Sequence, residues 1–414
     1  MAEPSFLGSN IKRVKDHNLR TILRSLLSEG SLSRIQLAQK TGLSATTITN
    51  LVDELIKDRV VLECQEDKPP EERLVGRPRS RLCLSTNIYN VIGVHMRVGV
   101  FRVAMVDIVG RVIDHIEREF TSATPAREVI LEIAQVIEEI ITRCKVQRGA
   151  ILGVGVGASG LINYQTGVNI LAANFGWREV PLRDWLAELL NLPVVVDNNV
   201  RCMALGEAMF GAGRGVNSLA FVYGRFGVGA GIVVDGKVFR GSGQGAGEIG
   251  HTIMNPHNGP LCRCGQRGCL EPLVSEPALA LQASQAAELH PGSVLAECMH
   301  GEDNSRPVKR LFQAYCLGDP WAKVIVETSA RYLGIALTNL VNLINPELIL
   351  LGGLFEEEQD IILPIARQTM VDTAFGGLGE KVRLEATRFG WQAGMIGAAS
   401  LALAKFLYLD PADF

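Results

Sequence analysis

The residue types best suited to chemistry lie together in residues 248–271, which read Glu248-Ile-Gly-His251 and, ten residues later, Cys262-Arg-Cys264-Gly-Gln-Arg-Gly-Cys269-Leu-Glu271. Three cysteines and one histidine form a ligand set that tetrahedral zinc takes up. The gap between histidine and the first cysteine lets a loop fold back and close a cage. The stretch therefore predicts Zn²⁺ as cofactor, bound by His251, Cys262, Cys264 and Cys269; the alternative is a group of ordinary buried thiols.

Two carboxylates, Glu248 and Glu271, flank this predicted metal site. If one ring nitrogen of His251 binds zinc, the other is free to act as an oriented donor. A zinc ion with a full ligand set supports its surroundings, whereas a hydrolytic zinc keeps one coordination position open. Because carboxylates accept hydrogen bonds from hydroxyl groups, the cluster suits a polyol ligand. The alternative is that both carboxylates only hold the zinc ligands in place.

The motif E-x-G-H followed by C-x-C-G-x-x-G-C-x-E resembles the signature of the ROK family of repressors, open reading frames and sugar kinases. In that family the zinc loop lies beside a sugar pocket. The segment Asn174-Phe-Gly-Trp177 is similar to the family's N-x-x-G-W, whose Asn reaches a sugar hydroxyl; the alternative is a loop residue capping a helix at Trp177. The resemblance implies these sugar-binding residues: Asn174, Asn198, Asn199, Glu248, His251 and Glu271.

The positions that would face phosphate depart from the kinases of this family. Where kinases have D-x-G-G-T-K, the chain has His95-Met-Arg-Val-Gly-Val100, and where they have G-T-G it has Gly227-Val-Gly229. The base position reads Asn199, which cannot accept a proton at neutral pH, and Asp197 is out of register. Since metal anchor, phosphate donors and base are all absent, we predict no catalytic residues and no enzyme activity.

The first 86 residues predict a winged helix-turn-helix domain. A helix over Ile11–Leu27, with Val14 among its apolar positions, follows a frayed start; Ser33 and Gln36 form a capping box, and Gly42 precedes a third helix over Ala45–Asp58. Small polar residues at the start of that helix suit contacts with DNA, as does a basic wing between strands at 60–63 and 81–84. The predicted DNA-binding residues are Ser44, Thr46, Thr47, Thr49, Asn50, Arg77 and Arg79. The alternative is a small helical oligomerisation or peptide-binding domain.

From Tyr89 the pattern changes to strands and helices of an α/β body. With the resemblance, this implies a two-lobed, actin-like sugar-kinase fold behind the winged helix. We expect the domains to span residues 1–86, 87–198 and 199–414. The C-terminal helix, Gly394 to Phe406, would return to the first lobe by family resemblance.

The bulk composition narrows the class of protein. Of 414 residues, 47% are apolar and 21% charged, and no apolar run reaches membrane-spanning length. The first ten residues lack a signal-peptide pattern, and nine cysteines, an odd number, fit a reduced cytoplasm better than a disulfide framework. Residues 1–86 hold 14 Lys/Arg against 11 Asp/Glu, and the rest holds 27 against 33. A weakly basic head on an acidic body hints at an anionic partner for the head.

These observations predict a cytoplasmic transcriptional regulator, in family terms a repressor of carbohydrate-metabolism genes. Its partners would be double-stranded operator DNA, a monosaccharide effector and further copies of itself, as a dimer or tetramer, with no membrane contact. One alternative is a bifunctional ROK sugar kinase with a DNA-binding head. Another is a zinc-dependent DNA-binding protein controlled by a protein partner.

Overall fold

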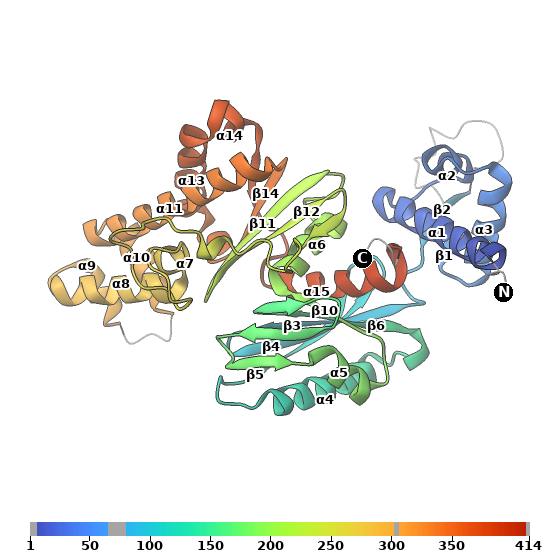
Figure 1. Cartoon of the computed structure of the whole chain (residues 1–414), viewed down its shortest axis with the longest axis horizontal. Helices are drawn as coiled ribbons and strands as arrows, with labels where there is room; N and C mark the ends of the chain where they lie inside the picture. The colour runs from blue at the N-terminus through green and yellow to red at the C-terminus, as the bar shows by residue number, and fades with distance from the viewer. Residues whose placement is uncertain (1–5, 65–79, 302–305, 411–414) are drawn as a thin grey trace, which may run out of the picture. The chain divides into compact units, whose positions relative to one another are not determined.

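The computed structural model describes residues 6–64, 80–301 and 306–410, and the chain divides into two compact units. Unit 1 comprises residues 1–199 together with 395–414, and unit 2 comprises residues 200–394 (Figure 1). A helical head with a small hairpin precedes two α/β sheets, which is the predicted fold class. Across the described ranges, no helix is long and apolar enough to span a bilayer.

The head consists of helices α1 (Phe6–Glu29), α2 (Arg34–Thr41) and α3 (Ala45–Lys57) and strands β1 (Val61–Cys64) and β2 (Arg81–Leu84). Helix α1 begins five residues before the predicted start, so the expected fraying of residues 6–10 is wrong. No proline follows Pro4 until well beyond Gly30, so nothing in the sequence interrupts the helix earlier. Val14, one of the predicted apolar positions of this helix, is exposed.

The turn between α2 and α3 is fixed by its predicted caps. Ser33 and Gln36 form the capping box, and Gly42 takes the left-handed conformation with φ of 72°. Such a φ is costly for residues with a Cβ, so glycine ends α2 here. The hydroxyl of Ser44 then accepts the backbone N–H of Thr47 and starts α3. These caps set the angle at which α3 leaves the turn.

Unit 1 contains a five-stranded sheet in the order β10-β6-β3-β4-β5. Strands β3 to β5 form an antiparallel meander, while β6 and β10 run parallel to β3. Helices α4 and α5 lie on one face, and α15 lies against β3 and β6 (Figure 1). A Cβ at Gly155 of β6 would lie 1.9 Å from the carbonyl of Ala398, so glycine permits this close packing. The bounds are β3 Asn90–Arg97, β4 Val100–Asp107, β5 Val112–Glu119, α4 Ala126–Cys144, β6 Ile151–Ala158, α5 Leu182–Leu190, β10 Val194–Asn198 and α15 Ala393–Leu403.

A three-stranded sheet, β7-β8-β9, is attached to unit 1. Its strands are β7 (Leu161–Asn163), β8 (Val168–Ala172) and β9 (Trp177–Val180). Trp177 therefore begins a strand, and the alternative in which it began a helix is wrong. Its ring packs edge-on against Phe175 at 5.1 Å between centroids, so burial of two aromatic rings fixes this turn.

Unit 2 contains a second five-stranded sheet with the same pattern of directions, in the order β13-β12-β11-β14-β15. Three strands are antiparallel, and β14 and β15 follow β11 in parallel. Helix α6 covers one face and helices α11 and α13 the other. The bounds are α6 Asn199–Phe210, β11 Ser218–Gly224, β12 Val228–Val234, β13 Lys237–Phe239, β14 Leu348–Gly353, β15 Arg383–Ala386, α7 Glu271–Val274, α8 Glu276–Leu289, α9 Val294–Met299, α10 Pro307–Cys316, α11 Pro320–Ile344, α12 Leu354–Glu357, α13 Gln359–Thr373 and α14 Leu378–Lys381.

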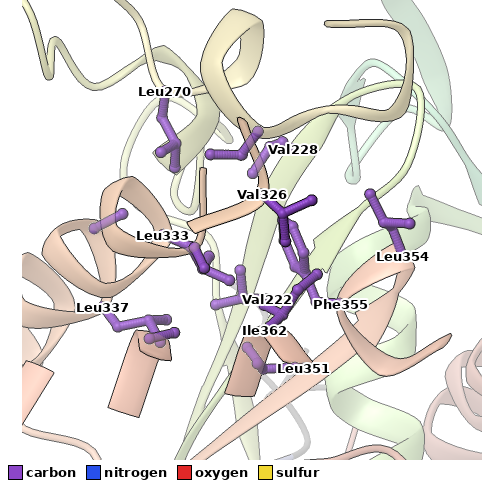
Figure 2. Packing of buried hydrophobic residues seen from close by; sticks show 14 of the residues in the cluster. Val222, Val228, Leu270, Val326, Leu333, Leu337, Leu351, Leu354, Phe355 and Ile362 are labelled. Carbon is purple, nitrogen blue, oxygen red and sulfur yellow. The ribbon is translucent and has the colours of Figure 1, made fainter. Parts of the chain in front are cut away.

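Alternation along β11 explains how both faces of this sheet are buried. Ala220 and Val222 join the core beneath α11 and α13, whereas Leu219 and Phe221 join the core beneath α6. Figure 2 shows Val222 in the first of these cores, which also includes Val228 and Leu270. Leu270 lies between the last predicted zinc ligand and Glu271, so this core anchors the end of the zinc loop.

Candidate functional site

The four predicted zinc ligands come together in unit 2. One donor atom from each of the four residues lies within 4.8 Å of the other three, although the chain separates them by up to 18 positions. His251 ends a short 3₁₀ turn, Ile249–His251, and backbone pairing of Ile253 with Cys269 closes the loop. The cluster is made by His251, Cys262, Cys264 and Cys269.

The spacing of these donor atoms fits a tetrahedral ion. The Sγ atoms of Cys264 and Cys269 are 3.6 Å apart, and Nδ1 of His251 is 3.6 Å from Sγ of Cys262. Zinc with Zn–S bonds of about 2.3 Å holds its sulfurs about 3.7 Å apart in a tetrahedron. Nδ1 faces the cluster, which leaves Nε2 of His251 for a partner outside it.

The thiols of the cluster differ in acidity. The backbone N–H of Gln266 lowers the pKa of Cys264 to about 7, while burial raises the pKa of Cys269 to about 12 and also raises that of Cys262. A metal ion requires thiolates, so binding at neutral pH must displace protons from the two buried thiols. The four donors together could hold a metal ion.

Glu248 directly precedes the 3₁₀ turn that carries His251, and the amide of His251 donates to its carbonyl at 3.1 Å. The residue keeps solvent access, yet the protein packed around its carboxyl raises the pKa by desolvation. The charges of His251 and Arg201 lower that pKa, and Glu271 raises it. Glu248 is thus an accessible acceptor, near two nitrogen-bearing side chains, as recognition of hydroxyl groups requires.

Glu271 has a different environment. Its residue is buried, one carboxylate oxygen accepts the backbone N–H of Val228 at 3.1 Å, and the other accepts from Arg263 at 2.9 Å. Arg263 stands between two of the metal ligands and also donates to the carbonyl of Phe226. Glu271 therefore joins the loop of the Cys/His cluster to the β11–β12 turn. Each of its oxygens can accept a further hydrogen bond, and its sugar-binding role stays a prediction.

The predicted asparagines belong to unit 1. The side chain of Asn198 donates to the carbonyl of Gly160 at 3.0 Å, and its backbone N–H donates to Asp197 at 2.7 Å. Asn199 is buried, and Asp197 is fully buried in β10, which places its carboxylate inside the unit. Asn174 is half-buried in the turn between β8 and β9. These contacts hold the ends of strands, and the sugar-binding role of the three asparagines stays a prediction.

A network of ion pairs surrounds the β11–β12 turn of unit 2. Arg225 at its start pairs with Glu276 of α8 at 3.4 Å and with Glu357 of α12, and Arg306 pairs with the same two carboxylates. Glu276 is buried, and the guanidinium of Arg225 lowers the pKa of Glu357 against desolvation. The aligned loop of the family's kinases presents a hydroxyl at this turn, and here Val228 begins β12 instead.

The candidate DNA interface is the exposed face of α3. Ile48, Leu51, Val52 and Leu55 are buried, which leaves the opposite side of the helix to solvent. Thr46, Thr49 and Asn50 are exposed there, spaced three and four residues apart so that their side chains share one face. Ser44 and Thr47 instead bond each other at 2.8 Å in the cap. The predicted wing residues Arg77 and Arg79 lie outside the described residues.

Ion pairs of Arg34 connect helix α3 to α2 and to the hairpin. Arg34 at the start of α2 pairs with Asp53 of α3 at 2.8 Å and with Glu63 of β1 at 3.3 Å. These ion pairs are partly exposed, so each contributes little to stability. Their effect is to hold the α2–α3 angle and the base of the hairpin together.

Comparison with known proteins extends the match over nearly all of the chain. The ROK family profile matches residues 91–405, and a winged helix-turn-helix DNA-binding profile matches residues 15–61. A xylose repressor from Caldicellulosiruptor bescii is 29% identical over 396 residues, which cover 95% of this chain and 97% of the repressor. A glucokinase from Halalkalibacterium halodurans is 32% identical over 310 residues, which cover 75% of this chain and 94% of the kinase.

Among solved structures, a ROK family transcriptional regulator described as a homologue of the E. coli Mlc protein aligns with a TM-score of 0.82 at 27% identity. The alignment covers 96% of this chain and 98% of that regulator. The fold thus defines a helix-turn-helix regulator with a kinase-like body. The chain belongs to the ROK family, and it has the two-part architecture of the family's transcriptional regulators.

Arg201 and Arg225 take part in these sites, and the sequence reasoning did not identify their partners. The sequence does indicate that Arg201 is buried and bonded, because it is the one charge in an otherwise apolar stretch, Val200 to Leu205. The sequence gives no such indication for Arg225, since its partners Glu276 and Glu357 lie 51 and 132 positions away.

Proposed function

We propose that this protein is a transcriptional repressor of carbohydrate-metabolism genes, whose body binds a monosaccharide without phosphorylating it. One observation carries the proposal: an exposed polar face on α3 is joined, in one chain, to the accessible Glu248 beside a four-donor Cys/His cluster. The named repressor aligns over both parts, while the glucokinase aligns over three quarters of the chain. A repressor of this kind acts in the cytoplasm.

The DNA-binding part of the proposal assigns base readout to Thr46, Thr49 and Asn50. Thr47 and Ser44 lie at the start of the same helix, where backbone N–H groups and hydroxyls reach phosphate. The wing arginines, Arg77 and Arg79, would add charge and groove contact. One winged helix covers one half-site, so a dimer or tetramer gains affinity by engaging two.

The effector part assigns hydroxyl recognition to Glu248 and to Nε2 of His251. Asn174, Asn198, Asn199 and Glu271 are proposed as further sugar-binding residues by family resemblance, and Glu271 also holds the loop of the Cys/His cluster. A carboxylate accepts from two hydroxyls and an imidazole N–H donates to one, which together read the orientation of neighbouring hydroxyls on a sugar ring.

The metal part assigns Zn²⁺ to the four-donor cluster. His251 would bind through Nδ1, and the metal would fix its ring so that Nε2 points to the ligand. With all four positions taken by protein donors, the ion supplies rigidity and performs no chemistry.

The absence of catalysis is proposed from the phosphate-facing positions. His95, Val228 and Asn199 offer no acid for magnesium, no hydroxyl for phosphate and no base, and Arg225 is neutralised by carboxylates. The second candidate function, a sugar kinase with a DNA-binding head, is favoured by the glucokinase match.

One experiment tests the repressor proposal. A pool of random double-stranded DNA is selected on the full-length protein, and the selected sequence is titrated with and without D-glucose or D-xylose. We expect one preferred sequence, whose affinity changes with a sugar and whose preference changes in Asn50→Ala. Equal affinity for all DNA sequences, with no effect of sugar, would contradict it.

A further inference from the structure

Arg201 is a buried cation in the first turn of α6. It is 2% exposed, and its neighbours on the helix, Val200, Cys202 and Met203, are buried as well. An arginine is almost never buried to this extent unless its guanidinium is bonded. The guanidinium of Arg201 must therefore donate hydrogen bonds to acceptors inside the protein.

Arg201 contacts a loop that lies outside its own helix. Nη1 donates to the backbone carbonyl of Gln244 at 2.6 Å, across 43 positions of the chain. Gln244 lies in the glycine-rich segment 240–247, between β13 and the turn that carries Glu248 and His251. Its φ is +61°, a left-handed conformation that residues with a side chain rarely adopt.

The other end of this segment is bonded to β12. The amide of Ala230 donates to the carbonyl of Gly247 at 2.7 Å, and φ of Gly247 is +94°. A Cβ at Gly247 would lie 1.9 Å from the carbonyl of Ala230, so only glycine fits this approach. Glu248 follows directly, so the bonds from Arg201 and from the amide of Ala230 both attach the loop that presents its carboxylate.

We propose that Arg201 is a positioning residue for the effector site, which holds the loop 240–247 through the carbonyl of Gln244 so that Glu248 is in place before the monosaccharide arrives. The inference rests on the proposed sugar-binding function. A loop with four glycines has many conformations to lose on binding, and a loop already ordered loses fewer. A charged donor makes this bond stronger than a neutral one would.

The bond goes to a backbone carbonyl, which gives a matched pair of tests at Gln244. Gln244→Gly keeps the carbonyl and suits the left-handed φ. It also removes Oε1, which has no hydrogen-bond partner among the described residues. Gln244→Val keeps the carbonyl too, but a β-branched residue disfavours this φ and should displace the loop.

The experiment is calorimetric titration of full-length protein with D-glucose and with D-xylose. For the sugar that binds wild type, we expect Arg201→Met and Gln244→Val to weaken binding by about 10-fold or more, from the size of a charge-assisted hydrogen bond. Gln244→Gly adds only backbone freedom, so it should weaken binding by about fivefold or less. The control Arg331→Met, which removes an exposed arginine paired with Glu327 on α11, should bind as wild type does. Arg201→Lys should recover part of the affinity.

Metal content and DNA affinity are measured on every variant to separate loss of fold from loss of positioning. If Arg201→Met does not fold, Gln244→Val against Gln244→Gly decides the matter. Unchanged sugar affinity in Arg201→Met or in Gln244→Val, with metal and DNA binding intact, would overturn the inference while leaving the proposed function in place. A wild-type protein that binds neither sugar would remove the proposed function and this inference with it.

Discussion

Two neighbouring loops of unit 2 have opposite electrostatic designs. At the β11–β12 turn, Arg225 and Arg306 each form ion pairs with Glu276 and Glu357. In the loop before the 3₁₀ turn, the carboxylate of Glu248 keeps access to solvent. In the first arrangement both arginines are paired with carboxylates, whereas the second offers an acceptor to solvent.

Under the proposed function, the difference separates the groups that sugar recognition needs from those that catalysis needs. Catalysis of phosphoryl transfer requires groups that stabilise charge developing on phosphate, while recognition requires only contacts with the sugar. Glu271 and Arg263 bond the loop that carries the Cys/His cluster to the β11–β12 turn, through the carbonyl of Phe226 and the amide of Val228. The ion-pair turn is therefore bonded to the loop that carries the Cys/His cluster, to which His251, three residues after Glu248, also belongs.

The largest expected effect comes from the metal. Structural zinc contributes about 10–16 kcal/mol of binding free energy in small domains, so protein purified without added zinc should contain about one equivalent. Cys269→Ser should lose it, whereas Cys316→Ser, an exposed thiol on α10, should keep it. Metal analysis gives the result. A folded wild type without metal, or a Cys269→Ser protein with a full equivalent, would contradict the assignment.

The next effect tests the ion-pair turn. Glu276→Gln leaves Arg225 and Arg306 with Glu357 alone, and an uncompensated buried charge costs about 3–5 kcal/mol. The matched change Glu327→Gln, in the exposed pair with Arg331, should cost about 0.5 kcal/mol or less. Urea unfolding measures the change in the transition of unit 2. Equal changes for the two variants would mean that the network does not support the turn.

The ligand-facing loop is tested by Glu248→Ala. Loss of a charged acceptor should weaken sugar binding by about 10-fold or more, while DNA affinity without sugar stays unchanged. DNA binding should then no longer respond to sugar, as measured by fluorescence anisotropy. Glu288→Ala, an exposed carboxylate on α8, is the control. Loss of DNA affinity in Glu248→Ala alone would show a structural role instead.

The effect confined to the fewest ligands concerns DNA readout by the head, because it changes discrimination at a single base pair. Asn50→Ala should remove about 1–3 kcal/mol of discrimination at one base pair and leave affinity for other sequences nearly unchanged. The exposed Asn87, beyond β2, serves as the control substitution. Selection from a random DNA pool compares the variants. The same sequence preference in Asn50→Ala and wild type would exclude this residue from readout.

Local signals made most of the fold predictable. Ser33, Gln36, Gly42 and Ser44 act within a few residues of themselves, so their caps could be read from the sequence and are confirmed. The Cys/His cluster was predictable for a related reason, since metal ligands are few in type and here lie within one short stretch. Strand-and-helix order and the family motif together gave the two-sheet body.

What could not be predicted depends on distant partners. The pairing of Arg225 with Glu357 joins residues 132 positions apart, and nothing in the spacing of the chain indicates it. The bonds that Val228 and Arg263 donate to the two oxygens of Glu271 join residues of different elements, and the sequence pattern does not indicate the bond to Val228. Trp177 begins a strand because its ring packs on Phe175, which overrides the local turn pattern.

The central claim is that the body binds a monosaccharide but does not phosphorylate it. The most direct measurement is one preparation of wild-type protein, titrated with D-glucose and D-xylose by calorimetry and incubated with the same sugars, Mg²⁺ and ATP. The account predicts saturable heat with one of the sugars and no sugar phosphate. Sugar-dependent ATP consumption that is lost in Glu248→Ala would contradict it and identify a kinase with a DNA-binding head.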